Sequence, residues 1–161
     1  MPLVSIVMGS DSDLAVMQKA ADVLAEFDIQ SEMRILSAHR TPKAAGEFAE
    51  SAERRGVRVL IAGAGRAAHL PGVMAASTIL PVIGVPIGGG PLDGLDALYA
   101  IVQMPSGIPV GTVGIDGAKN AGLLAVAILA AGDEGLRKKL HEYRAKMADE
   151  VLAKDAKLQG R

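Results

Sequence analysis

The chain has 161 residues, which is enough for one domain with a substantial core and short for two. Aromatic residues make up 2% of the chain and the net charge is −1, with no basic block, which argues against a nucleic-acid-binding protein. Cysteine is absent, so disulfide bonds, thiolate nucleophiles and thiolate metal sites are excluded.

Short apolar segments alternate with longer helical segments along the chain. Five strands are predicted, at Leu3–Met8, Glu32–Leu36, Val57–Ala62, Pro81–Val85 and Val110–Ile115. Helices are predicted from the loop after the first strand to Phe27, over 42–55, up to Thr78, and over 95–102 and 119–131. This alternation is typical of a three-layer α/β/α sandwich with a central parallel sheet. In such folds the ligand crevice lies at the carboxyl ends of the strands.

Residues 132–161 are expected to form a long C-terminal helix that follows an α/β catalytic domain of residues 1–131. Leu136, Leu140, Tyr143, Met147 and Val151 form a narrow apolar stripe on an otherwise charged segment. Such a helix packs either on its own domain or on a neighbouring subunit. Half of the residues in the chain are apolar, and this excess favours the neighbouring subunit.

The N-terminal sequence MPLVSIVMGS has no basic region and runs directly into a predicted strand, so no signal peptide is expected. The apolar run within NAGLLAVAILAAG is shorter than the roughly 18–20 residues that span a bilayer. These features predict a cytoplasmic protein without a membrane partner.

The loop MGSDSD places small and hydroxyl residues where a helix begins. Free backbone N–H groups at that point suit a phosphate, with Ser10 or Ser12 as further donors and Asp13 better suited to a ribose hydroxyl. The alternative is ordinary helix capping, since Ser10 and Asp13 have the spacing of a variant capping box. No Gly-Lys-Ser/Thr sequence follows, so ATP hydrolysis is not supported.

The second loop, LSAHRTP, places His39 and Arg40 between a predicted strand and a predicted helix. Thr41 is predicted to cap that helix and Pro42 to occupy its first position. Arg40 has a planar donor fork suited to phosphate, which would leave His39 beside the bound molecule as a general acid and base. The alternative for His39 is an ordinary surface position.

The third loop, AGAGRAAHLPG, matches a loose dinucleotide fingerprint at Gly63, Gly65 and Ala68. It follows the third strand rather than the first, and no acidic residue follows at the expected distance, which argues against a nicotinamide-binding oxidoreductase. The other interpretations are close helix–strand packing, or backbone amides that hold a carboxylate or CO2-sized group.

No residues have the spacing of metal ligands. The three histidines are far apart in the sequence, at His39, His69 and His141. The loop carboxylates Asp93, Asp96 and Asp116 are interpreted as caps.

Together these motifs resemble the N5-carboxyaminoimidazole ribonucleotide mutase family of purine biosynthesis. The resemblance lies in VMGSDSD at 7–13, SAHRTP at 37–42, AGAGRAAHLPG at 62–72, PVIGVP at 81–86, IVQMPSGIPVGTV at 101–113 and KNAGLLAVAILA at 119–130. These motifs follow the order and spacing of the family over roughly residues 3–131.

The resemblance implies a flavodoxin-like α/β sandwich, a homo-octamer whose C-terminal helix embraces a neighbour, and no cofactor. It implies that a carboxylate moves from N5 to C4 of an aminoimidazole ribonucleotide, with His39 as the catalytic residue. The implied substrate-binding residues are Ser10, Ser12, Asp13, Ser37, Ala38, Arg40, Gly65, Ala68, His69 and Leu70.

Arg66 departs from the commoner family pattern, which has glycine at this position. A related class II branch carboxylates aminoimidazole ribonucleotide with free CO2 and tends to have an arginine in a corresponding AGR motif. AHLPG and SAHRTP favour the mutase, and the class II reaction is the alternative. A non-enzymatic nucleotide sensor is a more distant one.

Overall fold

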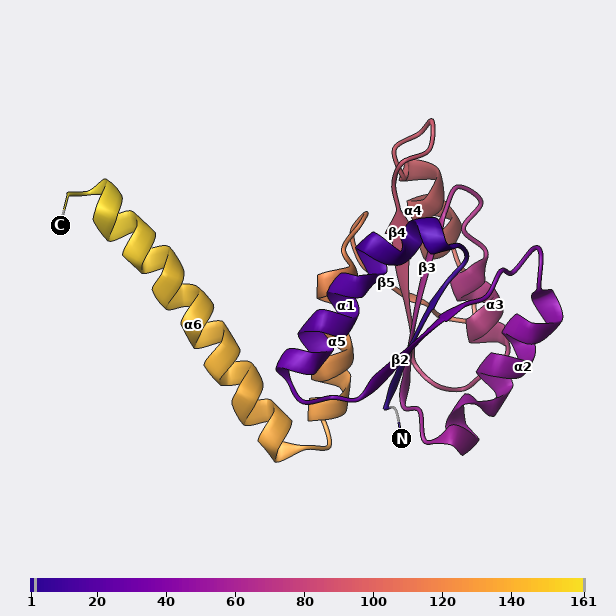
Figure 1. The fold of residues 1–161 in the computed structure, drawn as a ribbon, viewed down its shortest axis with the longest axis horizontal. Helices are drawn as coiled ribbons and strands as arrows, with labels where there is room; N and C mark the ends of the chain where they lie inside the picture. The colour runs from indigo at the N-terminus through magenta and orange to yellow at the C-terminus, as the bar shows by residue number, and fades with distance from the viewer. Residues whose placement is uncertain (2, 161) are drawn as a thin grey trace. The chain divides into compact units, whose positions relative to one another are not determined.

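A computed structural model describes residue 1 and residues 3–160, with five strands in one parallel sheet (Figure 1). The strand order is β2-β1-β3-β4-β5, and neighbouring strands are all parallel. The strands are β1 Val4–Met8, β2 Ser31–Ile35, β3 Val59–Gly65, β4 Val82–Ile87 and β5 Gly111–Thr112. This order is the flavodoxin-like one, so the predicted fold is confirmed.

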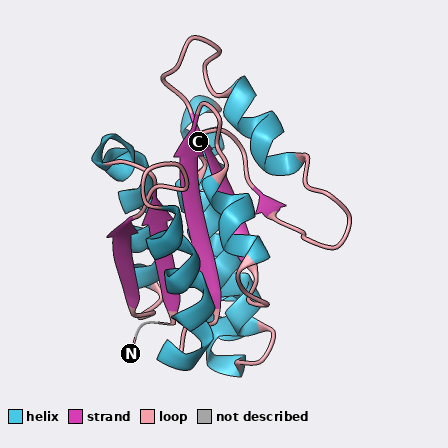
Figure 2. Cartoon of the chain, turned by 90° about the vertical axis from the view of Figure 1, so that its right-hand side faces the viewer, coloured by secondary structure: helices cyan, strands magenta, loops and turns pink. Residues whose placement is uncertain are grey.

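Helices cover both faces of the sheet, so the central strands are buried on two sides (Figure 2). Every residue of β1 and β4 is buried, and so is β3 up to its last residue. Strand β2 lies at one edge and is only partly buried. Continuous apolar runs are typical of parallel strands covered on both faces, whereas the sequence SEMRI of β2 suits an edge.

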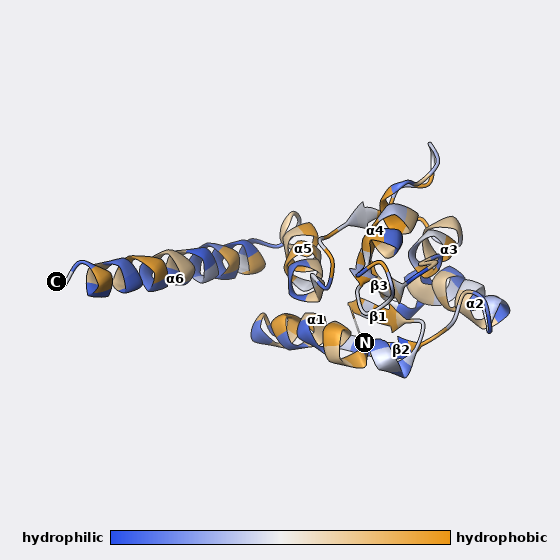
Figure 3. Ribbon diagram, turned by 90° about the horizontal axis from the view of Figure 1, so that it is seen from above, coloured by the Kyte–Doolittle hydropathy of each residue, from blue (hydrophilic) through white to orange (hydrophobic). Residues whose placement is uncertain are grey.

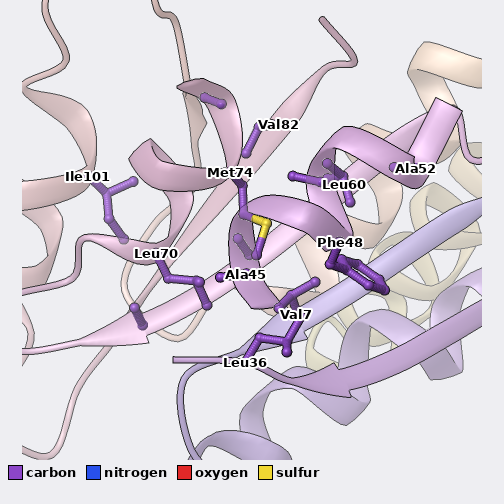
Figure 4. Close-up of a cluster of buried hydrophobic side chains, with 14 of the residues drawn as sticks. Val7, Leu36, Ala45, Phe48, Ala52, Leu60, Leu70, Met74, Val82 and Ile101 are labelled. Carbon is purple, nitrogen blue, oxygen red and sulfur yellow. The ribbon is translucent and has the colours of Figure 1, made fainter. Parts of the chain in front are cut away.

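One face of the sheet packs against α2 (Pro42–Ala52), α3 (Leu70–Ala76) and α4 (Leu95–Val102). Figure 4 shows the cluster formed there, in which Val7, Leu60 and Val82 project from the strands. The helices contribute mainly aliphatic side chains and one aromatic ring, namely Ala45, Phe48, Ala52, Leu70, Met74 and Ile101. The core is therefore almost entirely aliphatic, in keeping with an aromatic content of 2%.

The opposite face packs against α1 (Leu14–Glu26), and the first part of α5 (Ala118–Ala130) packs against α1. Glycine permits close approach at two points in this layer. A Cβ on Gly63 of β3 would lie 2.3 Å from Sδ of Met17, and a Cβ on Gly122 would lie 2.3 Å from Cγ1 of Val23. Both positions therefore require a residue without a side chain.

A polar cluster joins β1 to the edge strand β2. The hydroxyl of Ser5, which is fully buried, donates to Oε1 of Glu32 over 2.6 Å. Arg55 forms an ion pair with the same carboxylate and stacks its guanidinium 4.2 Å from the ring centre of Phe48. Burial alone would raise the pKa of Glu32, but the hydrogen bonds from Ser5 and Arg55 and the nearby positive charge lower it overall.

All five strands are found, and β3 and β5 differ most from their predicted extents. Strand β3 continues through Gly65, because its backbone pairs with β1 as far as Gly63 and with β4 as far as Gly65. Strand β5 is only Gly111–Thr112 rather than 110–115, because it pairs with β4 over two positions alone. The helix over 42–55 changes to a 3₁₀ turn at Glu53–Arg55, and the left-handed Gly56 ends it.

A second compact unit comprises Val126–Arg161 and contains the helix α6, Glu134–Leu158. Asp133 caps this helix by accepting from the backbone N–H of Leu136. The guanidinium of Arg137 donates to the carbonyls of Ala130 and Ala131, which closes the preceding helix end. Figure 3 shows that α6 is largely hydrophilic with isolated hydrophobic residues; Met147, Val151, Leu152 and Leu158 are exposed.

Candidate functional site

A cavity of about 720 Å³ lies at the carboxyl ends of the strands, where the chain order reverses between β1 and β3. Its walls are the loops that follow β1, β2, β3 and β4, together with Asp116 from the loop after β5. Most of the residues predicted for the site line it: Ser10, Ser12, Asp13, Ser37, Ala38, His39, Arg40, Gly65 and Leu70. This location is where open α/β sheets bind small ligands.

The loop after β1 forms a tight turn before α1. A 3₁₀ helix, η1 (Asp11–Asp13), precedes α1, and the hydroxyl of Ser10 accepts from the backbone N–H of Ser12 over 3.4 Å. The serine therefore caps η1 rather than α1, which differs from the predicted capping box. Two further side-chain contacts hold the turn: Ser10 donates to Asp11, and Ser12 donates to Asp13.

Asp13 is a half-buried carboxylate in the wall of the cavity. Burial raises its pKa above the ordinary value, against the opposing effect of hydrogen bonds from Ser12 and the Ser10 backbone. Nearby Asp11 raises it further. The carboxylate is therefore held where it is poorly solvated, which suits a group that accepts from a ligand hydroxyl.

Ser37 organises the loop after β2. Its hydroxyl accepts from the backbone N–H and from Nε of Arg40, over 3.1 and 3.4 Å. Its backbone N–H donates to Oγ1 of Thr41, and its carbonyl accepts from the same hydroxyl. Thr41 occupies the N-cap position and Pro42 begins α2, as predicted, but the Thr41 hydroxyl does not cap the helix and bonds back to Ser37 instead.

Arg40 extends from this loop toward the loop that follows β1. Its Nη2 donates to the carbonyl of Gly9 over 3.4 Å, directly beside the turn that begins at Ser10. The adjacent parallel strands β1 and β2 therefore bring the guanidinium and the serine-rich turn to one side of the cavity. This is the juxtaposition expected of an anion site.

His39 faces the loop that follows β3. Its Nε2 lies 2.7 Å from Nδ1 of His69, and the two rings meet edge to face with centroids 4.8 Å apart. His69 does not itself line the cavity, and Ala68 beside it is buried. Ala68 is therefore covered by the loop, whereas His69 is exposed and contacts the site through His39.

The loop after β3 contains Arg66 in a left-handed conformation, with a φ of 53°. Its side chain lines the cavity and runs along the loop that follows β4. The glycines before it serve packing. A Cβ on Gly63 would overlap Met17, and one on Gly65 would lie 3.2 Å from the carbonyl oxygen of Ile87. Close helix–strand and strand–strand packing thus accounts for the apparent dinucleotide fingerprint.

The glycine-rich loop after β4 is part of the site that sequence reasoning missed. Its backbone N–H at Gly88 donates to Oδ1 of Asp116 over 2.9 Å, so Asp116 fixes this loop rather than capping α5. The run of three glycines was the available signal. The cavity residues not predicted as binding residues are Gly9, Val16, Ala64, Arg66, Ala67, Ile87, Gly88, Gly89, Gly90 and Asp116.

Among residues 1 and 3–160, no three histidine or acidic side chains gather as a metal site would require. Over the same residues, every helix is too short or too polar to cross a bilayer.

The sheet and its cavity define a flavodoxin-like α/β protein with a cavity at the strand-order reversal, where such folds bind small ligands. The model of the AIR carboxylase family matches residues 3–150. The chain belongs to this family.

Relatives share more than half of their residues with this chain. A protein of Mycobacterium tuberculosis named N5-carboxyaminoimidazole ribonucleotide mutase is 59% identical over 98% of this chain and 91% of its own length. One of the same name from Pyrococcus abyssi is 60% identical over 91% of this chain and 84% of its own length. The crystal structure of Treponema denticola PurE is 32% identical, with a TM-score of 0.87 over 98% of this chain and 99% of that one. The predicted family is therefore confirmed.

Proposed function

We propose that this protein is an N5-carboxyaminoimidazole ribonucleotide mutase, an isomerase of purine biosynthesis that moves a carboxylate from N5 to C4. The observation that carries the proposal is one cavity lined by Ser10, Asp13, His39 and Arg40. Family membership and the names of relatives at 59–60% identity support it.

The ligand's phosphate binds between Arg40 and the turn after β1. The guanidinium supplies the positive charge, and the hydroxyls of Ser10 and Ser12 are in reach of the same anion. Asp13 accepts from a ribose hydroxyl. These contacts place the aminoimidazole ring toward the loops that follow β2 and β3.

His39 moves one proton twice, so the reaction is balanced without an added acid or base. The N5–carboxyl bond breaks, CO2 leaves, and N5 takes a proton from the His39 imidazolium. C4 then attacks the trapped CO2, and the proton displaced from C4 returns to His39. CO2 must stay in the cavity between these steps, so exclusion of water favours the transfer.

The class II carboxylation is the competing reaction, and one experiment separates the two. Purified protein is offered N5-carboxyaminoimidazole ribonucleotide, and then aminoimidazole ribonucleotide with bicarbonate, with formation of the C4-carboxylated product as the readout. We expect efficient turnover in the first case. Efficient turnover only in the second would make the protein a carboxylase, and turnover in neither would exclude both.

A matched variant tests the role of His39. His39→Asn keeps a polar side chain and removes the titrating group, so we expect loss of at least about a hundredfold in kcat. The variant should bind the nucleotide and retain its melting temperature. Near-normal turnover by His39→Asn would exclude His39 as the catalytic residue.

The protein is further proposed to be a cytoplasmic homo-octamer in which the C-terminal helix packs on a neighbouring subunit. The exposed apolar residues of α6 support this proposal, since they suit a protein partner. Light scattering after gel filtration measures the mass. Met147→Asp with Val151→Asp should reduce it, and an unchanged octamer would remove α6 from the interface.

A further inference from the structure

Arg66 is held in a backbone conformation that disfavours it. Its φ of 53° lies in the left-handed region, where a side chain such as arginine is strained and glycine is not. Such strain is retained where the surrounding structure or the function of the side chain requires it.

The side chain of Arg66 faces the cavity, and its guanidinium is available to bind a ligand. It lines the cavity and passes Gly90, with Cγ 3.4 Å and Nε 3.8 Å from the point where a Gly90 Cβ would lie. The glycine therefore leaves room for the guanidinium stem. Among the hydrogen bonds and ion pairs of the described residues, none involves the Arg66 guanidinium.

The two arginines of the cavity lie on different sides of it. Arg40 reaches the end of β1, whereas Arg66 reaches the loop after β4, and β3 lies between these strands. Two strand spacings amount to about 10 Å, which exceeds the span of one phosphate. The geometry therefore suits a ligand with two separate anionic groups.

We infer that Arg66 binds the carboxylate that the reaction moves, while Arg40 binds the phosphate. This inference rests on the proposed function. The carboxylate has to lie near His39, which transfers the proton, and His39 contacts His69, three residues beyond Arg66. Arg66 is the cation on that side of the cavity.

The chemistry predicts a specific kinetic signature. Substrate and product both carry a carboxylate, whereas the CO2 formed between them is neutral. Arg66 therefore stabilises the two bound states more than the step that separates them. Loss of Arg66 should raise KM and leave kcat unchanged or slightly higher.

Two ligands that differ only in the carboxylate test the inference. Calorimetric titration compares 4-carboxy-5-aminoimidazole ribonucleotide with 5-aminoimidazole ribonucleotide on the wild type, Arg66→Gly, Arg66→Lys and Arg40→Lys. Arg66→Gly should weaken the carboxylated ligand by about tenfold to a hundredfold and the other by less than about threefold. Arg66→Lys should be intermediate, because it keeps the charge and loses the planar fork.

The controls separate this inference from its alternatives. Arg40→Lys should weaken both ligands to a similar degree, and the melting temperature of Arg66→Gly should equal or exceed that of the wild type. Equal weakening of both ligands by Arg66→Gly, or no weakening of the carboxylated one, would overturn the role of Arg66 alone. Failure of the wild type to bind either ligand would overturn the proposed function, and the role of Arg66 with it.

Discussion

His39 and His69 are in direct contact beside the candidate site, with Nε2 of the first 2.7 Å from Nδ1 of the second. One nitrogen must donate and the other accept, so the pair holds a single proton at this contact. His69 thereby selects the tautomer and the orientation of His39. The pair joins the loops that follow β2 and β3, which belong to strands that are not neighbours in the sheet.

Replacing His69 should therefore impair His39 without removing it. For His69→Phe, which keeps a ring and loses the nitrogen that contacts His39, we expect kcat to fall by about tenfold or more and KM to change by less than about threefold. His69→Gln restores a hydrogen-bonding group and should recover part of the loss. Steady-state kinetics measures both, and equal kcat for all three proteins would show that the contact has no catalytic role.

Ser37 should matter for ligand affinity rather than for stability. Ser37→Ala removes the hydroxyl that accepts from two N–H groups of Arg40, so the guanidinium loses its position. We expect nucleotide affinity to fall about tenfold, equivalent to about 1.4 kcal/mol. Ser77→Ala is the matched control, because Ser77 donates only to the carbonyl of Val73 and does not line the cavity. Equal affinities for the two variants would contradict the prediction.

Glu32 should make the stability of the fold depend on pH. Its pKa in the folded protein lies below the ordinary value of 4.5, so it stabilises the fold above that pH. Glu32→Gln should lower the free energy of unfolding at pH 7 by roughly 1 kcal/mol. The difference should shrink below pH 4.5 and disappear as the pH falls through the folded pKa of Glu32.

Denaturant unfolding at several pH values measures this dependence. The control is Glu47→Gln, which removes the exposed ion pair with Lys43 and should change stability by less than about 0.5 kcal/mol at any pH. A pH-independent difference for Glu32→Gln would refute the electrostatic interpretation of this cluster.

Two glycines inside helices should respond to alanine with opposite signs. A Cβ on Gly122 of α5 would lie 2.3 Å from Val23 and 3.0 Å from the carbonyl oxygen of Ala20, which is backbone and cannot move aside. Gly122→Ala should destabilise the fold by about 1–3 kcal/mol. Gly46→Ala in α2 meets only the Ser77 hydroxyl, at 3.8 Å, and should stabilise by about 0.5–1 kcal/mol. Thermal unfolding of both variants provides the test, and the same sign for both would contradict it.

The sequence was sufficient for the fold because its signals are local and repeated. Five apolar runs with intervening amphipathic segments predict the order of elements, and buried strands such as β1 carry no competing polar pattern. The predicted strand for β3 ended too early, at Ala62, because glycines follow. Gly63 and Gly65 suggested a loop, but pairing with β1 and β4 holds them in the strand. For β5 the apolar pattern was longer than the two-residue stretch that pairs with β4.

The candidate site was predictable where its residues fall in loops next to strand ends. His39 and Arg40 follow this rule, and their neighbourhood with the first loop follows from parallel pairing of β1 and β2. The contact between Asp116 and Gly88 spans 28 residues and depends on where two loops turn, which no short pattern encodes. The same holds for the contact between His39 and His69.

The assembly of the cavity from five separate loops has a consequence for folding. Its residues lie between Gly9 and Asp116, and they meet only after β1, β2, β3 and β4 have found their registers. Such long-range pairing forms slowly, so nucleotide binding should appear late in refolding. A bound nucleotide then contacts loops that are far apart in the sequence and holds them together. It raises the stability of the whole sheet as its concentration exceeds its dissociation constant.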